Sequence, residues 1–293
     1  MRLSDRAIIA LRGEGVRKFL NGLCAQELLT SQASPTVPSR STAFFAPFLN
    51  SHGRVLFDSL IYSKTAEGDQ EEVLIDVHAS LKSRVLRHLV RHKLREAFSI
   101  SDTDLSVVAQ QEGTPPTTID WITDPRYRKL PVRGVVSVGP TTDSVAEYHA
   151  IRIGLGVPEG PYEFDESLPL HMNLDFLHGI SFTKGCYIGQ ELTTRTMRRG
   201  VIRRRLVVLK RIREIQSPSD IFVPNAEVRS LLGQPIGRVV ASAGENSIAQ
   251  IGAGNGEALN DRAIAAAALS AVGNVTVNGV EAEVIVPGYY YED

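Results

Sequence analysis

The alternation of apolar and polar positions along the chain predicts a mixture of strands and helices. The segment RAIIALRG is apolar and rich in strand-forming residues, and Gly13 and Gly15 permit a turn after it. The following VRKFLNGLCAQELL brings apolar residues to helical spacing, which predicts a helix that contains Cys24. We therefore expect a strand and then a helix between Ser4 and Leu29.

The clearest predicted helix lies between Ala79 and Phe98. Apolar residues share one face there, and basic residues mostly occupy the other, namely Lys82, Arg84, Arg87, Arg91 and Lys93. Before it, STAFFAPFLNSHGRVLFDSLIYSK contains two strand-like runs around NSHG, which indicates a hairpin. The segment EEVLIDV predicts a further strand.

The rest of the chain is predicted to end in a β-rich module. QEGTPPTTIDWITDPRYRKLP indicates an irregular stretch, GVVSVG a strand, and Ser144 to Ile153 a short helix. From near Gly200, VIRRRLVVLKRI is typical of an edge strand, and QPIGRVVASA, NVTVNG and EAEVIVPGYY indicate further strands. The alanine run from Ala263 to Ala271 conflicts with this pattern, because its helix propensity is high.

Length and charge limit the class of protein. With 293 residues, 43% of them hydrophobic, the chain can form two or three units with cores of their own. Lys plus Arg total 32 against 33 for Asp plus Glu, so the net charge of -1 gives no global attraction to nucleic acid or anionic membrane. No apolar run reaches the ~18 residues of a membrane helix, so we expect no membrane partner.

Two features of the sequence bear on its compartment. Cys24 and Cys186 lie far apart and form no CxxC, so neither a disulfide framework nor a four-cysteine site is available, which favours a reducing compartment. The start MRLSDRAIIA lacks a signal-peptide core and a mitochondrial presequence. We expect either an untargeted protein or a mature form.

The segment KGCYIGQE carries the candidate chemistry. Gly185 and Gly189 bracket Cys186 and allow its sulfur to be presented on a tight loop. Positive charge from Lys184 before it, and from Arg195, Arg198 and Arg199 after it, would favour the thiolate, which soft metals and iron–sulfur clusters bind. Gln190 and Glu191 are expected to bond loop amides or begin a helix.

Residue chemistry alone leaves a simpler interpretation of Cys186 open. In that interpretation Cys186 is a small buried thiol that packs beside Tyr187 and Ile188, since free cysteines are often buried. A thiol hydrolase is disfavoured, because neither His171 nor His178 has a spacing that identifies it as a partner base.

Three other patterns in the sequence have a functional interpretation and a purely structural one. The basic run from Arg195 to Arg213 can hold phosphate or an acidic partner, or it is a solvated edge strand. His88 and His92 have zinc-like spacing, but HLVRH lacks the Glu of HExxH and is better explained as a solvated helix face. GAGNGEALN lacks a nucleotide-binding pattern and indicates a turn.

Several segments together resemble a known family. RAIIALRGEGVRKFLNGL, FLNSHGRVLFDSLIY, GVPEGP, SLPLHMNLDFLHGISFTKGCYIGQELTTRT and GQPIGRV, in this order, are similar to the YgfZ-type family of folate-binding, aminomethyltransferase-like proteins, and in particular to its mitochondrial branch of iron–sulfur cluster assembly factors. The resemblance covers nearly the whole chain, and KGCYIGQE is its most specific motif.

The resemblance implies an α+β, aminomethyltransferase-like fold of three domains around a central cavity. They are a discontinuous first domain of residues 1–50 and 145–200, an inserted ferredoxin-like α+β domain of residues 51–144, and a C-terminal β-barrel-like domain of residues 201–293. It also implies tetrahydrofolate as a ligand, with Asp58 and Arg195 as candidate contacts. Transferases carry paired acids at the position of Phe57 and Asp58, so one carboxylate is missing here.

The function implied is that of an assembly factor which acts with A-type carrier proteins in 4Fe–4S cluster maturation. In that hypothesis Cys186 donates one ligand to a cluster shared with the carrier, and Lys184, Gly185, Gly189 and Gln190 shape its loop. The resemblance places the protein in the mitochondrial matrix, or in the cytoplasm if it is bacterial. The alternatives are a folate-dependent aminomethyl transferase, for which no acid–base pair is evident, and a non-catalytic adaptor.

Overall fold

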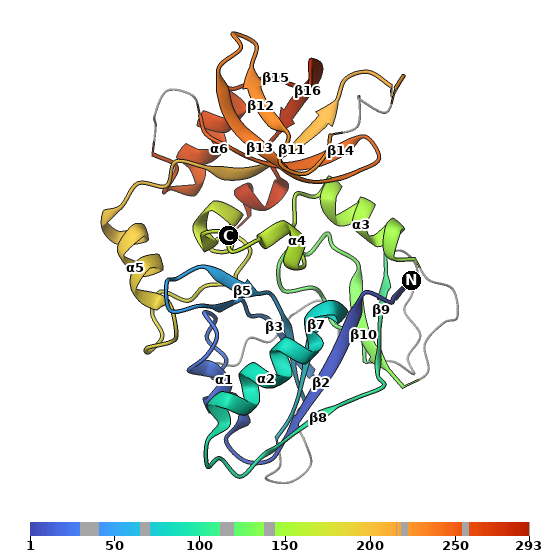
Figure 1. The fold of residues 1–293 in the computed structure, drawn as a ribbon, viewed down its shortest axis with the longest axis vertical. Coiled ribbons are helices and arrows are strands. Elements are labelled where there is room, and N and C mark those ends of the chain that lie inside the picture. The colour runs from blue at the N-terminus through green and yellow to red at the C-terminus, as the bar shows by residue number, and fades with distance from the viewer. Residues whose placement is uncertain are drawn as a thin grey trace. The chain divides into compact units, whose positions relative to one another are not determined.

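The computed structural model describes residues 1–29, 41–64, 71–111, 120–137, 144–214, 216–217, 222–253 and 258–292. The structure divides into two compact units (Figure 1). The first unit contains Met1–Tyr148, Gly160–Tyr162 and His178–Gln190, and the second contains His149–Glu159, Glu163–Leu177 and Glu191–Asp293. Parts of the predicted irregular stretch (112–119) and of GAGNGEALN (254–257) lie outside the described residues.

The first unit is built on a five-stranded antiparallel sheet. Its strand order is β3 (Ser41–Phe45), β6 (Leu60–Lys64), β7 (Glu72–His78), β2 (Arg6–Arg12) and β8 (Ser99–Asp102). A second sheet joins β1 (Arg2–Leu3), β9 (Ser106–Gln110) and β10 (Val132–Val136), and β4 (Phe48–Leu49) pairs with β5 (Val55–Phe57). The strands predicted from RAIIALRG and EEVLIDV and the hairpin around NSHG are therefore present.

Two helices complete the first unit. α2 (Lys82–Lys93) continues a short 3-10 turn, η1 (Ala79–Leu81), and buries Val85 and Leu89 in the core formed with the five-stranded sheet. It ends at Leu94, whose φ of 50° is not helical. α1 (Val16–Asn21) is shorter than the sequence predicted, because the chain turns at Gly22, so Cys24 lies outside the helix in a β-bridge with Phe48.

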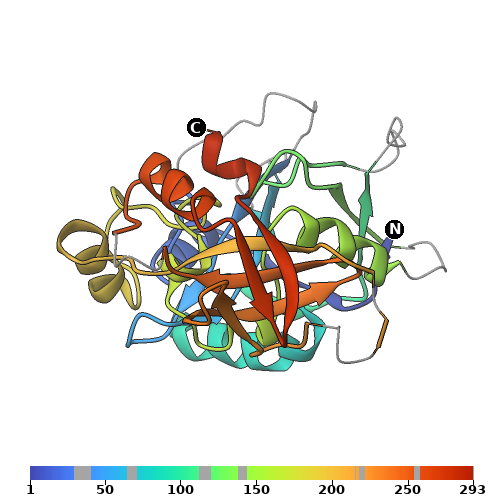
Figure 2. The same cartoon turned by 90° about the horizontal axis from the view of Figure 1, so that it is seen from above.

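The second unit contains a closed antiparallel barrel, seen from above in orange and red in Figure 2. Its strands follow the order β11 (Arg205–Arg211), β14 (Asn246–Ile251), β13 (Pro235–Ala243), β12 (Glu227–Ser230), β15 (Asn274–Val277) and β16 (Val280–Ile285). The prediction of an edge strand at β11 was wrong, since β11 pairs with both β14 and β16. The alanine run is the helix α6 (Arg262–Ser270), which begins at an Asp261 side-chain cap.

Short helices connect the remaining segments. They are α3 (Val145–Gly154), α4 (Pro161–Phe164), η2 (Pro169–Met172), α5 (Gln190–Arg199) and η4 (Gly288–Tyr291).

The structure divides the chain differently from the three predicted domains. Residues 1–50 and 51–144 fall in one unit, because β2 pairs with β7 and β8, and β3 pairs with β6, across the expected boundary.

Candidate functional site

Cys186 lies on an exposed loop of the first unit. Its side chain is exposed, and a Cβ added to the neighbouring Gly185 would meet no atom within 4 Å. The loop begins where the Ser181 amide donates to the Ala25 carbonyl at 2.9 Å, and it ends where the Gln190 amide donates to the Tyr187 carbonyl at 3.3 Å. The thiol is therefore open to a large reaction partner, and the interpretation of Cys186 as a buried packing residue is wrong.

Lys184 fixes this loop from the inside. Its ammonium group donates to the carbonyl oxygens of Asn21 at 2.6 Å, Cys24 at 3.0 Å and Gln26 at 2.7 Å, and it lies 5.2 Å from the centre of the Tyr187 ring. These carbonyls are available because α1 ends at Asn21, so the turn after it has no intrahelical donors. Burial lowers the pKa of the Lys184 ammonium, while Cys24 and Glu27 act in the opposite direction.

The sequence predicted that Lys184 shapes the loop and that its positive charge favours the Cys186 thiolate. The ammonium binds three backbone carbonyls, which agrees with the first role, and its effect on the thiol stays a prediction. Arg195, Arg198 and Arg199 are exposed on α5, of which all but the first residue belongs to the second unit. Their influence on Cys186 stays a prediction.

The end of the KGCYIGQE segment packs closely on the β4–β5 hairpin. Gly189 has a φ of 81°, and a Cβ at this position would lie 2.5 Å from the Asn50 carbonyl oxygen and 2.7 Å from the Leu49 Cβ. Glycine is required here because a side chain would be strained and would collide with the hairpin. Tyr187 is buried, and burial raises the pKa of its hydroxyl to about 12, with Cys24 adding to the shift. The loop is thus held on both sides of its exposed tip.

Cys24 is a very different thiol. It is fully buried, and its Sγ donates to the Gln26 carbonyl at 3.3 Å. Burial raises the pKa of Cys24 to about 11, although Lys184 acts in the opposite direction. Its position in a β-bridge lies outside the helix that the sequence predicted. Cys24 stays protonated near neutral pH and is inert compared with a free surface thiol.

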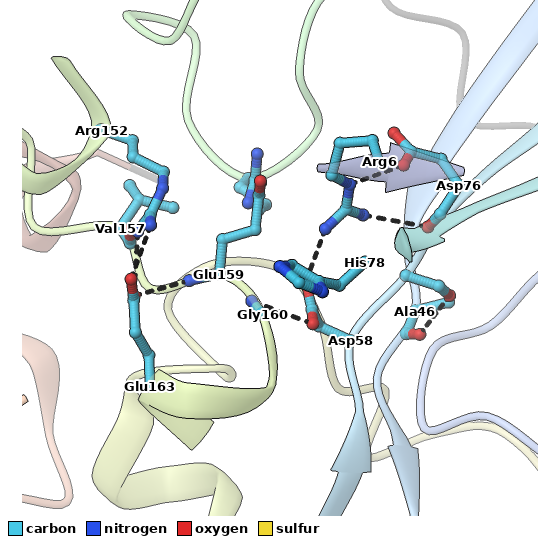
Figure 3. Close-up of polar contacts among 12 residues, drawn as sticks. Arg6, Ala46, Asp58, Asp76, His78, Arg152, Val157, Glu159, Gly160 and Glu163 are labelled. Atoms are coloured by element: carbon cyan, nitrogen blue, oxygen red, sulfur yellow. Dashed lines mark hydrogen bonds and ion pairs between the residues drawn. The ribbon is translucent and has the colours of Figure 1, made fainter. Parts of the chain in front are cut away.

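Asp58, the candidate folate contact, is engaged inside the first unit (Figure 3). It follows β5, is 1% exposed, accepts the Gly160 amide at 3.1 Å, and lies 3.6 Å from an Arg6 guanidinium nitrogen. Arg6 in turn donates to Asp76 at 2.7 Å. These contacts make Asp58 a structural acceptor within the protein. A folate contact at Asp58 stays a prediction.

Asp76 belongs to a buried ionic network that sequence reasoning missed. Arg133 pairs with Asp76 at 2.9 Å, and Arg126 pairs with Asp124 at 2.7 Å. Tyr148 accepts hydrogen bonds from Arg126 and Arg133, and Tyr62 donates to Asp76. Burial raises the pKa of Tyr62 well above its ordinary value. The sequence gives no signal for this cluster, since its members come from segments distant in the chain and have no motif.

The predicted basic run divides into buried and exposed members. Arg205 is fully buried and binds the Asp175 carboxylate at 2.6 and 2.9 Å, while its guanidinium lies 4.0 Å from the centre of the Phe176 ring. Arg152, also in the second unit, forms a similar bidentate pair with Glu163 (Figure 3). Arg205 thus stabilises the fold, and the alternative of a fully solvated edge strand is wrong.

His88 and His92 lie side by side on α2, with ring centres 4.4 Å apart. His88 packs edge-on against Phe57 at 5.7 Å, so it is not part of a solvated face. Burial lowers the pKa of His88 to about 4, with further contributions from His92, Arg84 and Arg91. Within the described ranges, no group of three or more His, Cys, Asp or Glu side chains is arranged to hold a metal ion.

The described part of the chain contains no helix that is both long and apolar enough to cross a membrane.

In comparisons with known proteins, no protein-family model matches the sequence. The fold is shared with the crystal structure of glycine cleavage system aminomethyltransferase T from Bartonella henselae, with a TM-score of 0.65 and 12% identity over 99% of this chain and 85% of that chain.

Curated proteins give the stronger match. The chain is 32% identical over 271 residues to "Iron-sulfur cluster assembly factor IBA57, mitochondrial" of Homo sapiens, which covers 85% of this chain and 76% of the human protein. It is 34% identical over 275 residues to the protein of the same name in Mus musculus, again with coverages of 85% and 76%. By these identities and coverages, the chain belongs to the family of the iron–sulfur cluster assembly factor IBA57, in agreement with its resemblance to YgfZ-type proteins.

Proposed function

We propose that this protein assists iron–sulfur cluster assembly and that Cys186 supplies one thiolate ligand to a cluster shared with an A-type carrier protein. The names of the human and mouse relatives support the general role. The exposed position of Cys186 supports the specific one, because a cluster that passes between two proteins needs a ligand at the surface. In this proposal the cluster is cargo, destined for 4Fe–4S target enzymes.

The contrast between the two cysteines carries the proposal. Iron–sulfur clusters are held by several thiolates. Cys24 is buried with a raised pKa, so this chain can offer one accessible thiolate at most. The remaining ligands must then come from another protein. A carrier with cysteines of its own meets this requirement, and the open surface at Gly185 allows its approach.

Anaerobic reconstitution tests this proposal. The purified chain is mixed with an A-type carrier, iron and sulfide, and the complex is followed by visible absorption and size-exclusion chromatography. Cys186→Ala is expected to abolish the absorption of the shared cluster. Cys24→Ala is the matched control, because it also removes one thiol but leaves the exposed loop in place, and it should retain the cluster.

Two results would contradict the proposal. If Cys186→Ala forms the coloured complex as well as the unchanged protein does, Cys186 is not a ligand. If the unchanged protein and Cys186→Ala both associate with the carrier without any cluster signal, the chain is an adaptor.

The location of the protein is part of the same proposal. The relatives are named as mitochondrial, and we infer the mitochondrial matrix for a eukaryotic source and the cytoplasm for a bacterial one.

We propose tetrahydrofolate only as a ligand to be tested. The shared fold with an aminomethyltransferase favours it, but Asp58 is engaged by Gly160 and Arg6, and Arg195 is exposed on α5. Calorimetric titration with tetrahydrofolate, followed by an assay of methylene transfer, separates the alternatives. Binding with turnover would favour a transferase, and absence of binding would remove folate from the proposed function.

A further inference from the structure

The outward face of α2 carries a cluster of positively charged side chains. Arg84, Arg87 and Arg91 are exposed and are spaced three and four residues apart, which places them together on one side of a helix. That side lies opposite Val85 and Leu89, which are buried against the sheet. We call these three residues the arginine face; α2 is labelled in Figure 1.

The charges of the arginine face are not neutralised within the part of the chain that the structure describes. The ion pair at this helix is formed by Lys82, which binds Asp102, and none of Arg84, Arg87 and Arg91 has a carboxylate partner among the described residues. Arg95 adds a further exposed cation directly after the helix, and Glu96 is the one acid between residues 82 and 96. The whole chain has a net charge of -1, so this excess is local.

Exposed apolar side chains border the same face. Val90 on α2 is 60% exposed, and Leu94, the residue directly after the helix, is 87% exposed. Contacts of leucine and valine with a nucleic-acid backbone contribute little binding energy, and α2 contains no Phe, Tyr or Trp that could stack on a base. A surface that combines clustered arginines with exposed apolar side chains is instead typical of segments that lie on anionic lipid, where guanidinium groups bind phosphate and apolar groups enter the interface.

We propose that the arginine face of α2, with Val90 and Leu94, docks this protein on anionic phospholipid surfaces. The helix lies parallel to the membrane, and its 12 residues span about 18 Å, enough for several headgroups. The interaction is peripheral and electrostatic, and it does not depend on Cys186 or on the proposed cluster.

Vesicle sedimentation tests the proposal with the full chain. Binding is compared on vesicles of phosphatidylcholine alone and of phosphatidylcholine with phosphatidylglycerol. We expect binding only to the anionic vesicles. Raising the salt concentration from about 0.01 M to about 1 M shortens the Debye length from about 30 Å to about 3 Å and should abolish the binding.

Two matched variants locate the interaction. Replacing Arg84, Arg87 and Arg91 together by Gln should weaken partitioning by roughly a hundredfold, because each basic residue contributes separately near an anionic surface. The control replaces three other exposed cations by Gln, namely Lys18, Lys129 and Arg238, and changes the net charge equally. It should bind as the unchanged protein does. Circular dichroism and thermal unfolding establish that both variants fold.

Three outcomes would overturn the proposal. The first is absence of binding to the anionic vesicles at low salt. The second is equal loss of binding in both triple variants, which would indicate an effect of net charge. The third is binding of polyglutamate or single-stranded RNA, but not of vesicles, in a manner that requires the three arginines. The arginine face would then recognise an acidic protein or a nucleic acid.

Discussion

Removal of the Lys184 ammonium should loosen the turn after α1 far more than the surface position of this loop suggests. Lys184→Met keeps most of the side-chain stem but removes the ammonium donor from the carbonyls of Asn21, Cys24 and Gln26. The Gln26 carbonyl keeps one donor, the Cys24 thiol. A buried polar group without a partner costs about 1–3 kcal/mol. The net effect is smaller than the sum for the carbonyls, because the variant no longer buries an ammonium and because the losses at neighbouring groups are not additive. We expect the free energy of unfolding to fall by about 3 kcal/mol.

The buried thiol of Cys24 provides the assay. In a Cys186→Ala background, Cys24 is the only thiol left, and it reacts with a thiol reagent only when its surroundings open. A loss of about 3 kcal/mol in the free energy of opening corresponds to roughly a hundredfold faster labelling under native conditions. Lys82→Met is the control, since its ammonium pairs with Asp102 at the surface, where such pairs contribute about 0–1 kcal/mol.

The reasoning is refuted if Lys184→Met labels no more than about threefold faster than the Lys82→Met control, which would be a difference below about 1 kcal/mol. In that case the three carbonyls would find other partners, and the loop would not depend on the ammonium. Cluster binding is measured separately in Lys184→Met with Cys186 retained. If that variant loses the cluster at equal amounts of carrier but regains it with excess carrier, Lys184 positions Cys186 and does not bind the cluster itself.

Two further predictions follow from the same unit. Gly189→Ala should lower the free energy of unfolding in urea by about 2 kcal/mol or more, because φ at this position is 81° and the new Cβ would collide with the β4–β5 hairpin. Gly185→Ala is the control and should be nearly neutral, because the space around Gly185 is open. Equal effects of the two substitutions would contradict this reasoning. His88 has a folded-state pKa of about 4, below its unfolded value of 6.5, so its neutral form favours folding above about pH 6.5 and this stability is lost as the pH falls toward 4. Unfolding is compared at pH 7 and pH 4.5. Because His88 is only partly buried, we expect the stability lost between these pH values to be about 1 kcal/mol smaller in His88→Gln than in the unchanged protein. The control His52→Gln, at an exposed site, should lose as much stability as the unchanged protein.

Local patterns predicted most of the regular structure correctly. The α2 helix follows from its periodic apolar face, and the β4–β5 hairpin follows from two apolar runs around NSHG. The two errors have a common physical cause. After α1 ends at Asn21, Cys24 pairs with Phe48 of the hairpin, and β11 is a closed-barrel strand because it pairs with segments far along the chain. Distant pairing of this kind leaves no mark on local periodicity.

The candidate site was predictable in its motif and not in its supports. Gly185, Cys186 and Gly189 follow from the sequence, since glycines around a thiol indicate a loop. The binding of Lys184 to carbonyls near Cys24 joins segments about 160 residues apart, and no spacing rule reveals it. The burial of Asp58 against Arg6 and Gly160 depends on distant contacts in the same way.

The difference between the two thiols limits how this chain can handle a cluster. Cys24 is buried with a pKa of about 11, so making it a ligand would require opening the core at the turn that Lys184 holds. Cys186 is exposed and needs no such opening. A cluster bound through Cys186 alone would have most of its ligand positions facing outward. It would therefore be stable only while a partner occupies those positions, and release of the partner would carry the cluster away with the protein that holds more of its ligands.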